Sequence, residues 1–543
     1  MIEIAAGRRL PGMRLQHGRA LGWAIPRYVN IASLVAAQPS TSLALRYVLT
    51  DGTEQRYTFG DVRGAAARLA AFFNARGVRA GDRVAVVSLA HPHAAIAHLA
   101  CYRLGAVAVA LSPMLGERTL LERLEDVGAT LIVAEDTVSQ RLEGRTAIPV
   151  VATGTPLEHA IAQARPWTET ARTEAGDPCV IVFTSGTSGS AKGAVHPHRC
   201  AYGRVPGLFF SHGGQLAAGH GFWSPAEWSW IGGWLDSVIG PWLFGMHVVL
   251  DERIGKFDPE RALAGLARHR PDAAFVPPTA LRMMRAAATP RNVAGFTLRT
   301  IHSGGEALTP DLVEWCASLG CLVNEIYGQT EAGFIAGNAA PHQPVRDGSL
   351  GRAYPGHEMA ILDEGGQPVA CGVEGEIALR IDGDPTHFLG YWERGRGIAP
   401  APSTGFHRMG DRGTMDDDGY VQFCGRVDDV IGSSGYRIGP EEIETALRRH
   451  PAVHDAAAIG SPDPVRGEIV KAYVELKPAF AGGDDLVRAL QDFVRRDLAA
   501  YEYPRKIEFV DALPRTETGK VQRAILRARD REALLTRKDN DAP

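Results

Sequence analysis

The sequence has 543 residues, of which 45% are hydrophobic and 22% are charged, and its formal net charge is −4. A chain of this length exceeds one ordinary hydrophobic core, so two or more domains are expected. The small negative charge excludes the basic field that binding to nucleic acid or to an anionic membrane surface requires.

The N-terminal segment is basic but lacks the apolar stretch of a signal peptide, and no apolar run is long enough to span a bilayer. The seven cysteines are odd in number and form no Cys-x-x-Cys pair, and several of them lie in apolar runs. Buried, reduced thiols are therefore expected. We predict a cytoplasmic protein with no membrane span and no nucleic-acid partner.

The first part of the chain carries a hairpin signal and then an alternation of apolar runs and helix-period segments. Residues 44–49 and 55–57 flank an Asp51-Gly52 turn. Strands are predicted at 83–88, 106–111, 131–133, 248–251, 273–276, 298–302 and 322–326. Helices are predicted at 62–74, 94–104, 259–269, 279–287 and 310–318. This alternation is typical of βαβ units that build parallel sheets.

From about residue 350 the pattern changes to short strands separated by Gly-Asp turns, which indicates a small β-barrel. After Gly425 the pattern starts again as a compact unit with strands near 429–431, 455–459 and 470–476 and helices at 441–450 and 486–498. The predicted fold class is α/β, with a large multi-subdomain N-terminal domain over residues 1–427. A small α+β C-terminal domain is predicted over residues 428–543.

A loop rich in glycine and hydroxyl groups follows the buried strand at 179–183. Its residues are Thr184, Ser185, Gly186, Thr187, Ser188 and Gly189, and it closes on Lys192. Glycines let main-chain N–H groups approach an anion closely, and a lysine adds a point charge suited to phosphate. The alternative is a flexible linker. The sequence is not a Walker loop, because Ala191 and Gly193 stand where that loop needs Gly and Ser or Thr.

Two more loops follow predicted strands, Ser303-Gly-Gly-Glu306 and Gly328-Gln-Thr-Glu331. Ligands in open α/β sheets gather at such positions, so the three loops are expected at one crevice. Thr330 can donate to a phosphoryl oxygen, and Glu331 can hold Mg²⁺, a cation that prefers oxygen ligands. The alternative is an ordinary strand–loop connection with a capping threonine.

Four further segments are turns or surface charges when each is taken alone. They are Met409-Gly-Asp411, Gly425-Arg426, the stretch Gly432 to Ile438, and Pro514 to Lys520. Together with the loops above, and in this order, they resemble the adenylate-forming superfamily of acyl-CoA synthetases, peptide-synthetase adenylation domains and luciferases. The resemblance covers roughly residues 28–527 and is to the medium-chain and acetyl-CoA synthetase branch. Ser188 and Ala191 depart from the Thr and Pro of the family loop.

The resemblance implies roles for these residues in binding the nucleotide. The 184–189 loop and Lys192 would hold the phosphates, and Tyr327 would lie against the adenine beside Gln329 and Thr330. Gly305, Glu306 and Ala307 would cover the other side of the base. Asp411 would accept hydrogen bonds from the ribose hydroxyls, which suits a carboxylate facing a diol. Arg426 would make a second ribose or phosphate contact, and Glu331 would be the metal ligand.

For the C-terminal domain the resemblance implies mobility. Asp428 would be the hinge of a domain rotation between two half-reactions. Gly435 would then line the pantetheine path and Arg437 would contact a phosphate. Lys520 would enter the site only for adenylation, where it would stabilise the negative charge of the transition state.

The resemblance also locates an acyl pocket at Trp230, Ile231, Gly232, Gly304 and Gly328. Acetate-specific relatives have a Trp at the position of Gly328, so space for several methylenes is expected, a preference of about a hundredfold over acetate. The aromatic residues Phe222, Trp223, Trp228, Trp230 and Trp234 would form its wall, or else plain hydrophobic core.

The predicted function is an ATP-dependent acyl-CoA synthetase that uses ATP, Mg²⁺ and CoA. Its substrate is expected to be a medium-chain, branched or aryl carboxylic acid rather than acetate. Two alternatives stay open, a standalone ligase that loads a carrier protein and a decayed nucleotide-binding protein. A homo-oligomer, and a lysine acetyltransferase or deacylase acting at Lys520, are further hypotheses about partners.

Overall fold

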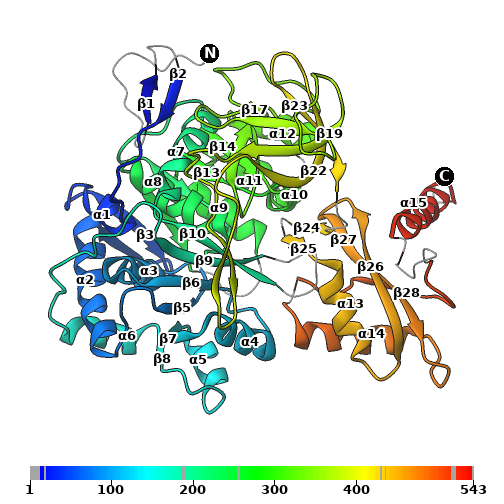
Figure 1. Ribbon diagram of the computed structural model, residues 1–543, viewed down its shortest axis with the longest axis horizontal. Coiled ribbons are helices and arrows are strands. Elements are labelled where there is room, and N and C mark those ends of the chain that lie inside the picture. The colour runs from blue at the N-terminus through cyan, green and yellow to red at the C-terminus, as the bar shows by residue number, and fades with distance from the viewer. Residues whose placement is uncertain are drawn as a thin grey trace. The chain divides into compact units, whose positions relative to one another are not determined.

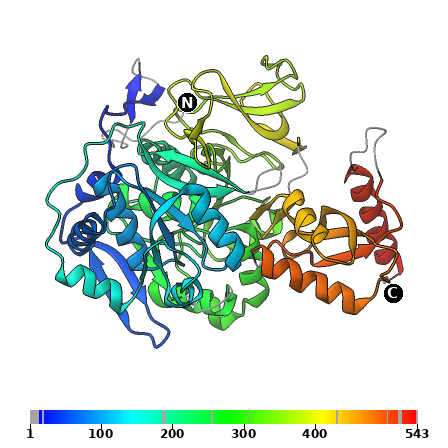
Figure 2. The same cartoon turned by 60° about the horizontal axis from the view of Figure 1, so that its bottom comes forward.

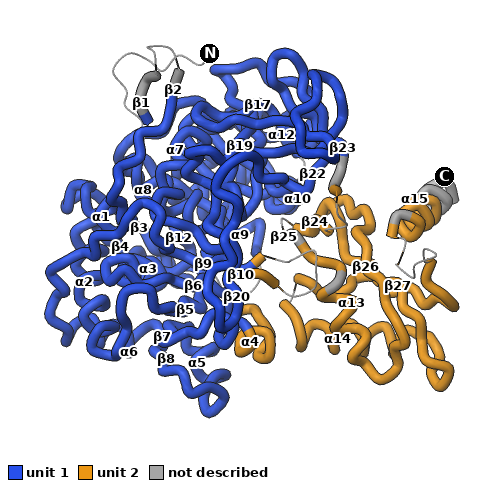
Figure 3. Tube along the Cα trace, in the orientation of Figure 1, with its two compact units in different colours: residues 1–113, 123–183, 193–425 blue, residues 114–122, 184–192, 426–543 orange. Residues whose placement is uncertain are grey.

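The computed structural model describes residues 13–16, 20–184, 191–252, 257–306, 308–427, 431–434, 436–499, 501–514, 521 and 523–540. The chain forms two compact units (Figure 3). Unit 1 comprises residues 1–113, 123–183 and 193–425, and unit 2 comprises residues 114–122, 184–192 and 426–543.

The first large sheet of unit 1 has eight strands in the order β21-β20-β10-β9-β6-β5-β7-β8 (Figure 1). The strands are β5 (Arg83–Val87), β6 (Val107–Leu111), β7 (Ala129–Ala134), β8 (Val150–Ala152), β9 (Pro178–Thr184), β10 (Lys192–Pro197), β20 (Gly390–Glu393) and β21 (Gly397–Pro400). The strands from β9 to β8 are parallel, as the alternating pattern predicted. Helices α2 (Phe59–Ala75), α3 (Pro92–Leu104), α5 (Asp136–Leu142) and α6 (Thr155–Gln163) of unit 1 connect or precede them. Helix α4 (Glu117–Val127) follows β6 in the chain, and its residues 117–122 belong to unit 2.

The second large sheet has nine strands in the order β17-β16-β15-β14-β13-β11-β12-β3-β4. They are β3 (Leu43–Val48), β4 (Glu54–Thr58), β11 (Gly221–Trp223), β12 (His247–Asp251), β13 (Ala273–Phe275), β14 (Thr300–Gly304), β15 (Leu322–Gln329), β16 (Gly333–Gly337) and β17 (Arg352–Ala353). The strands from β15 to β3 are parallel, and β4, β16 and β17 pair antiparallel with their neighbours. The predicted hairpin of β3 and β4 is confirmed.

Helix α3 shows how the two sheets share one core. Twelve of its residues are buried, and they pack with side chains of both sheets, such as Val180 and Val248. A helix that is apolar all round is suited to such a place between layers. Helix α2 begins at a capping box in which Thr58 and Asp61 bond each other's backbone N–H, and it buries Val62, Leu69 and Phe73 along one side.

The remaining helices of unit 1 are α1 (Ile31–Ala36), α7 (Cys200–Ser211), α8 (Gly240–Leu243), α9 (Pro259–His269), α10 (Pro278–Ala287), α11 (Pro290–Val293) and α12 (Pro310–Ser318). A π-helix, η1 (Gly232–Ile239), precedes α8. Strands β1 (Met13–Gln16) and β2 (Ala20–Trp23) form a small ribbon. A four-stranded sheet of β18 (Met359–Leu362), β19 (Gly375–Arg380), β22 (Phe406–Met415) and β23 (Val421–Arg426) corresponds to the predicted small barrel.

Unit 2 is built on a five-stranded sheet of β24 (Ile431–Ser433), β25 (Tyr436–Ile438), β26 (Val453–Asp463), β27 (Gly467–Leu476) and β28 (Lys506–Phe509). Helices α13 (Pro440–Arg448) and α14 (Asp484–Asp497) cover one face, where Ala456 and Ala458 of β26 point. Helix α15 (Arg523–Asn540) covers the other face, where Ala457 and Ile459 point (Figure 2). Successive side chains of β26 point to opposite faces of the sheet, so this strand contributes to two small hydrophobic cores.

Five of the seven free cysteines are buried, which confirms the expectation for those thiols, whereas Cys371 and Cys424 are exposed. In the described part of the chain, no helix has both the length and the apolar character needed to cross a membrane.

Candidate functional site

The connection between β15 and β16 is a tight turn that presents Thr330 and Glu331. The pairing of the two strands shifts register between Tyr327 and Gly328, and Gly333 has a φ of 65° that only glycine adopts readily. A Cβ atom on Gly328 would lie 1.9 Å from the Gly333 carbonyl oxygen. The glycines are thus required by the close approach of the two strands at the turn.

The Glu331 carboxylate is held in place by a neighbouring strand. Its Oε1 atom accepts a hydrogen bond of 2.8 Å from the Tyr391 hydroxyl, and its carbonyl oxygen accepts one of 2.9 Å from the Phe388 N–H. The residue is 8% exposed. Within the described ranges no group of three or more His, Cys, Asp or Glu side chains could hold a metal. A single fixed carboxylate fits Mg²⁺ carried on a nucleotide, because that ion takes one or two carboxylates and keeps phosphate and water ligands.

The structure brings Tyr327 and Asp411 together, although 84 positions separate them in the sequence. The Tyr327 hydroxyl donates a 2.7 Å hydrogen bond to Asp411 Oδ2, and both side chains are buried. The amide of Gln329 lies 3.0 Å from His407 Nε2 and 3.0 Å from Met409 Sδ on the same strand, β22. Residues of β15 and β22 that were predicted to bind the adenosine therefore share one place in unit 1.

The Glu306 side chain is held by two residues of α10. Both of its carboxylate oxygens accept from the Thr279 hydroxyl at 2.9 Å, and it forms an ion pair with Arg282. Gly305, beside it, has a φ of 91°. Thr279 and Arg282 were missed by the sequence analysis, and their only signal was the polar first turn of a predicted helix.

Several predicted residues lie outside the described residues. They are Ser185, Gly186, Thr187, Ser188, Gly189, Ala307, Asp428, Gly435 and Lys520. Thr184 is the last residue of β9 and Lys192 is the first of β10, so the two strands bracket the predicted phosphate loop. Arg426 ends β23 and Arg437 lies in β25, opposite Gly432.

The three glycines of the predicted acyl pocket differ in the room around them. A Cβ on Gly304 would lie 2.4 Å from the Ile326 carbonyl oxygen, and one on Gly328 would clash as described above. The expectation that these two glycines leave space for a substrate is wrong for this structure, because the neighbouring strand's backbone fills it. A Cβ on Gly232 would meet Phe275 at an ordinary 3.4 Å. Gly232 opens η1, directly after Trp230 and Ile231.

The aromatic cluster is largely hydrophobic core. Phe222, Trp223, Trp228 and Trp234 are buried, and only Trp230 is partly exposed. The Trp234 indole donates a 2.8 Å hydrogen bond to the Tyr102 hydroxyl of α3.

A buried polar group beside this core was not predicted. Arg204 of α7 and Asp236 of η1 form an ion pair at 3.2 Å, and Arg204 is fully buried. Burial raises the pKa of Asp236 to about 6, against the opposing effect of Arg204. His302 of β14 is also fully buried, and burial holds its pKa well below the usual value. The only signal in the sequence was a charged residue inside each of two apolar stretches.

Glu325 gives a prediction about pH. Burial raises the pKa of its carboxyl to about 7, although Oε1 accepts a 3.0 Å hydrogen bond from the Leu308 N–H. A folded-state pKa above the unfolded value of 4.5 means that the protonated form favours folding, so this stability is lost as pH rises through 7. We expect the melting temperature of the wild type to fall more than that of Glu325→Gln between about pH 5 and pH 9. Glu364→Gln, at an exposed position, is the control, and parallel curves for all three proteins would contradict the prediction.

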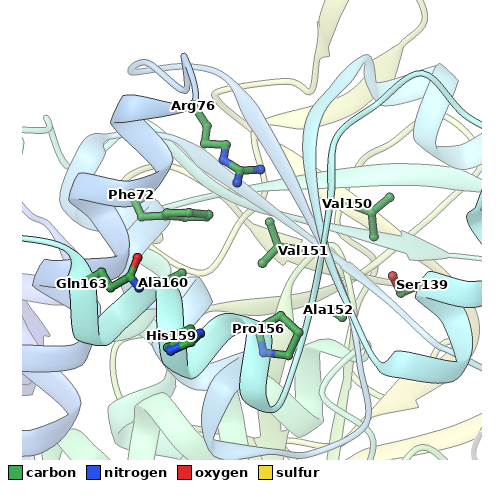
Figure 4. A pocket seen from close by; sticks show the side chains of 10 residues that line it. All are labelled: Phe72, Arg76, Ser139, Val150, Val151, Ala152, Pro156, His159, Ala160 and Gln163. Carbon is green, nitrogen blue, oxygen red and sulfur yellow. The ribbon is translucent and has the colours of Figure 1, made fainter.

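A separate cavity of about 430 Å³ lies between α2, α5, β8 and α6 (Figure 4). Phe72 of α2, Arg76 at the C-terminal end of that helix, Val151 of β8, and Pro156 and His159 of α6 line it. None of the predicted site residues lies in its wall.

Comparisons with known proteins identify the family of the chain. Residues 34–392 match the AMP-binding enzyme family, and residues 442–520 match the AMP-binding enzyme C-terminal domain. The rat mitochondrial acyl-coenzyme A synthetase ACSM2 is 35% identical over 93% of this chain and 92% of its own length.

Two solved structures are similar over most of their length. An acyl-CoA synthetase of Brucella canis is 35% identical with a TM-score of 0.68, covering 93% of this chain and 95% of its own. A benzoate CoA ligase of Burkholderia xenovorans is 27% identical with a TM-score of 0.65, covering 92% and 99%.

The fold and the family matches define an enzyme of the adenylate-forming class, and the chain belongs to the AMP-binding enzyme family. Within this family it is an acyl-CoA synthetase, an AMP-forming acid–thiol ligase that uses ATP, Mg²⁺ and CoA.

Proposed function

We propose that this acyl-CoA synthetase activates a medium-chain, branched or aryl carboxylic acid, with the described site of unit 1 binding the adenylate. The observation that carries the proposal is the hydrogen bond between Tyr327 and Asp411 next to the fixed Glu331 carboxylate. An aromatic ring, a carboxylate that can accept from a diol and a carboxylate that can hold Mg²⁺ are thus provided by β15, by β22 and by the turn after β15, as the base, ribose and phosphates of ATP require.

The reaction has two steps. A carboxylate oxygen of the acid attacks the α-phosphorus of ATP, the bond to the β-phosphate breaks, and pyrophosphate leaves. The thiolate of CoA then attacks the acyl carbon, a C–S bond forms, and AMP leaves with the electrons of the C–O bond. Neither step uses a nucleophilic side chain, so the enzyme contributes positioning and stabilisation of charge.

Each part of the nucleotide is assigned to residues of this chain. The 184–189 loop and Lys192 bind the phosphates, Thr330 donates to a phosphoryl oxygen, and Glu331 would hold Mg²⁺, which neutralises the charge that builds up on the phosphates. Tyr327 packs on the adenine and Asp411 accepts from the ribose. Hydrogen bonds from Thr279 and the ion pair with Arg282 position Glu306, and so the loop beside the base.

We extend the proposal to the organisation of the chain. Residues 1–427 and 428–543 would be separate domains with a hinge at Asp428, and the break between the two family matches, after 392 and before 442, supports this division. Lys520 and Arg426 would serve adenylation, and Gly435 and Arg437 would serve thioester formation. A cytoplasmic location, a homo-oligomer and acylation of Lys520 by a lysine acetyltransferase belong to the same set of proposals.

The experiment that tests the function identifies the acceptor. The enzyme is incubated with ATP, Mg²⁺ and a panel of acids from acetate to decanoate, with benzoate and a branched acid, and with either CoA or a phosphopantetheinyl carrier protein. Acyl-CoA and AMP are the expected products, with acetate a poor substrate. Acyl groups found only on the carrier protein, or acetate as the best acid, would contradict the proposal.

Pocket size is tested at Gly232, where an added Cβ atom would make contacts of 3.4 Å or longer. In Gly232→Leu the added side chain points toward Phe275 and occupies the volume of about three methylenes of substrate. We expect kcat/KM for octanoate to fall at least about tenfold more than kcat/KM for butyrate, with the apparent affinity for ATP nearly unchanged. An equal loss for both acids would place Gly232 outside the pocket.

A further inference from the structure

Arg204 and Asp236 stand at the centre of an unusual polar region beside the predicted acyl pocket. The Arg204 guanidinium lies 3.2 Å from the Asp236 carboxylate. The same nitrogen, Nη1, also lies close to β16, because a Cβ on Gly333 would lie 2.3 Å from it. Asp236 in turn lies 3.6 Å from the Cβ position of Gly232, one turn earlier in η1.

His302 is linked to these residues through two aromatic contacts. Its ring is 5.5 Å from the Phe334 ring, which follows Gly333 in β16, and 5.1 Å from the Phe275 ring. Phe275 is the residue that the Cβ position of Gly232 contacts at 3.4 Å. The contacts therefore form a closed circuit that includes Gly232, one of the residues of the predicted acyl pocket.

Polar atoms in this circuit lack hydrogen-bond partners among the described residues. Nε and Nη2 of Arg204 and Nε2 of His302 have no partner among them, whereas Nη1 of Arg204 and Oδ1 of Asp236 face each other in the 3.2 Å ion pair without the geometry of a hydrogen bond. The other ring nitrogen of His302 is bonded to the Ser211 hydroxyl at 3.1 Å. A buried polar atom without a partner costs about 1–3 kcal/mol, so several in one place require an explanation.

A purely structural ion pair would explain these atoms poorly. Pairs of buried charges are stable only when further hydrogen bonds satisfy their remaining atoms, and apolar residues often replace them without loss. Here both donors and an acceptor are left without hydrogen-bond partners among the described residues. A hydroxyl group satisfies both kinds, because it accepts through its oxygen and donates through its proton. A ketone or a second carboxylate offers acceptors alone.

Resting on the proposed function, we propose that the acid this enzyme activates carries a hydroxyl group on its acyl chain or ring. Arg204 donates to the hydroxyl oxygen, and Asp236 or His302 accepts its proton in a hydrogen bond. The ion pair is neutral as a whole, so an uncharged hydroxyl adds no uncompensated charge to the buried region.

The test compares matched acids in the AMP-forming assay with ATP, Mg²⁺ and CoA. Unsubstituted acids from butyrate to octanoate are set against the same acids with a hydroxyl on each carbon from the third outward, and benzoate against its hydroxy derivatives. Oxo acids and dicarboxylic acids are compared with the hydroxy acids in the same assay. We expect the best hydroxy acid to exceed its unsubstituted partner at least about tenfold in kcat/KM, because a site with unpaired polar groups rejects an analogue that lacks the hydroxyl.

The variants separate recognition from folding. His302→Phe, Asp236→Asn and the apolar double replacement Arg204→Met with Asp236→Leu are expected to lower the ratio of hydroxy to unsubstituted acid about tenfold. A structural role would lower both activities and leave the ratio unchanged. Asp384→Asn, which alters a different buried pair with His357 in unit 1, should not change the ratio.

The outcomes are distinguishable. In one outcome the enzyme forms AMP but prefers the unsubstituted, oxo or dicarboxylic acid to the hydroxy acid in every comparison. That result overturns the hydroxyl assignment and leaves the proposed function standing. An equal ratio of hydroxy-acid to unsubstituted-acid activity in the wild type, His302→Phe, Asp236→Asn and the double replacement also overturns the hydroxyl assignment. Absence of AMP with every acid overturns the proposed function itself.

Discussion

Glu331→Gln is expected to slow adenylate formation at least about a hundredfold, because a neutral amide is a far weaker ligand for Mg²⁺ than a carboxylate. The substitution keeps the shape of the side chain and an oxygen that can accept from Tyr391. The measurement is acid-dependent pyrophosphate release in a single turnover, over a range of Mg²⁺ concentrations. The loss should be in the chemical step and in the Mg²⁺ dependence.

The control is Tyr391→Phe, which removes the 2.8 Å hydrogen bond to Glu331 and keeps the charge. The loss of one such bond should cost about tenfold at most. Equal rates for Glu331→Gln and wild type at all Mg²⁺ concentrations would remove Glu331 from the metal site. A larger loss in Tyr391→Phe than in Glu331→Gln would also contradict the assignment.

Lys520→Ala is expected to reduce adenylation about a thousandfold while sparing thioester formation from a supplied acyl adenylate. The reason is electrostatic, since the lysine would stabilise charge that develops on the α-phosphate and the carboxylate only in the first step. Two assays are required, pyrophosphate release from ATP and acid, and acyl-CoA formation from synthetic acyl adenylate and CoA.

Lys506→Ala is the matched control for Lys520, because Lys506 is another lysine of unit 2, on β28, with no assigned role. It should leave both assays within about twofold of wild type. Equal losses in the two assays of Lys520→Ala would contradict the proposed domain rotation about Asp428.

The parallel strands could be predicted from sequence because both sheets are built from short apolar runs between helix-period segments. The buried β5 and β6 are examples, and their predicted limits differ from the observed ones by one residue. Strand ends also located the loops that carry Glu306 and Glu331, since parallel strands bring their carboxyl ends to one edge.

Helix α7 could not be predicted because it contains Gly203, Pro206 and Gly207, residues that normally interrupt helices. The structure supplies the reason for the two glycines. A Cβ on Gly207 would lie 2.3 Å from Phe334, and one on Gly203 would lie 2.3 Å from Thr386. Close packing against other elements accounts for this helix, whereas the helix propensity of its residues does not.

Pairs that depend on tertiary contacts were likewise beyond local patterns. Tyr327 and Asp411 were each assigned from resemblance, but their hydrogen bond joins two different sheets. The pairing of Arg204 with Asp236 had no signal except two charges in apolar surroundings. The prediction that Gly328 leaves space failed for a similar reason, because the backbone of β16 occupies the volume that a side chain would need.

Activation of a carboxylic acid as its adenylate is measured by ATP–pyrophosphate exchange. The wild-type protein is incubated with ATP, Mg²⁺ and labelled pyrophosphate, without CoA, in the presence and absence of each acid. We expect label to enter ATP only when a suitable acid is present, and we expect Glu331→Gln to be strongly impaired in this exchange. The absence of exchange with every acid in the panel would contradict adenylate formation. Formation of ADP in place of AMP when CoA is added would contradict it as well.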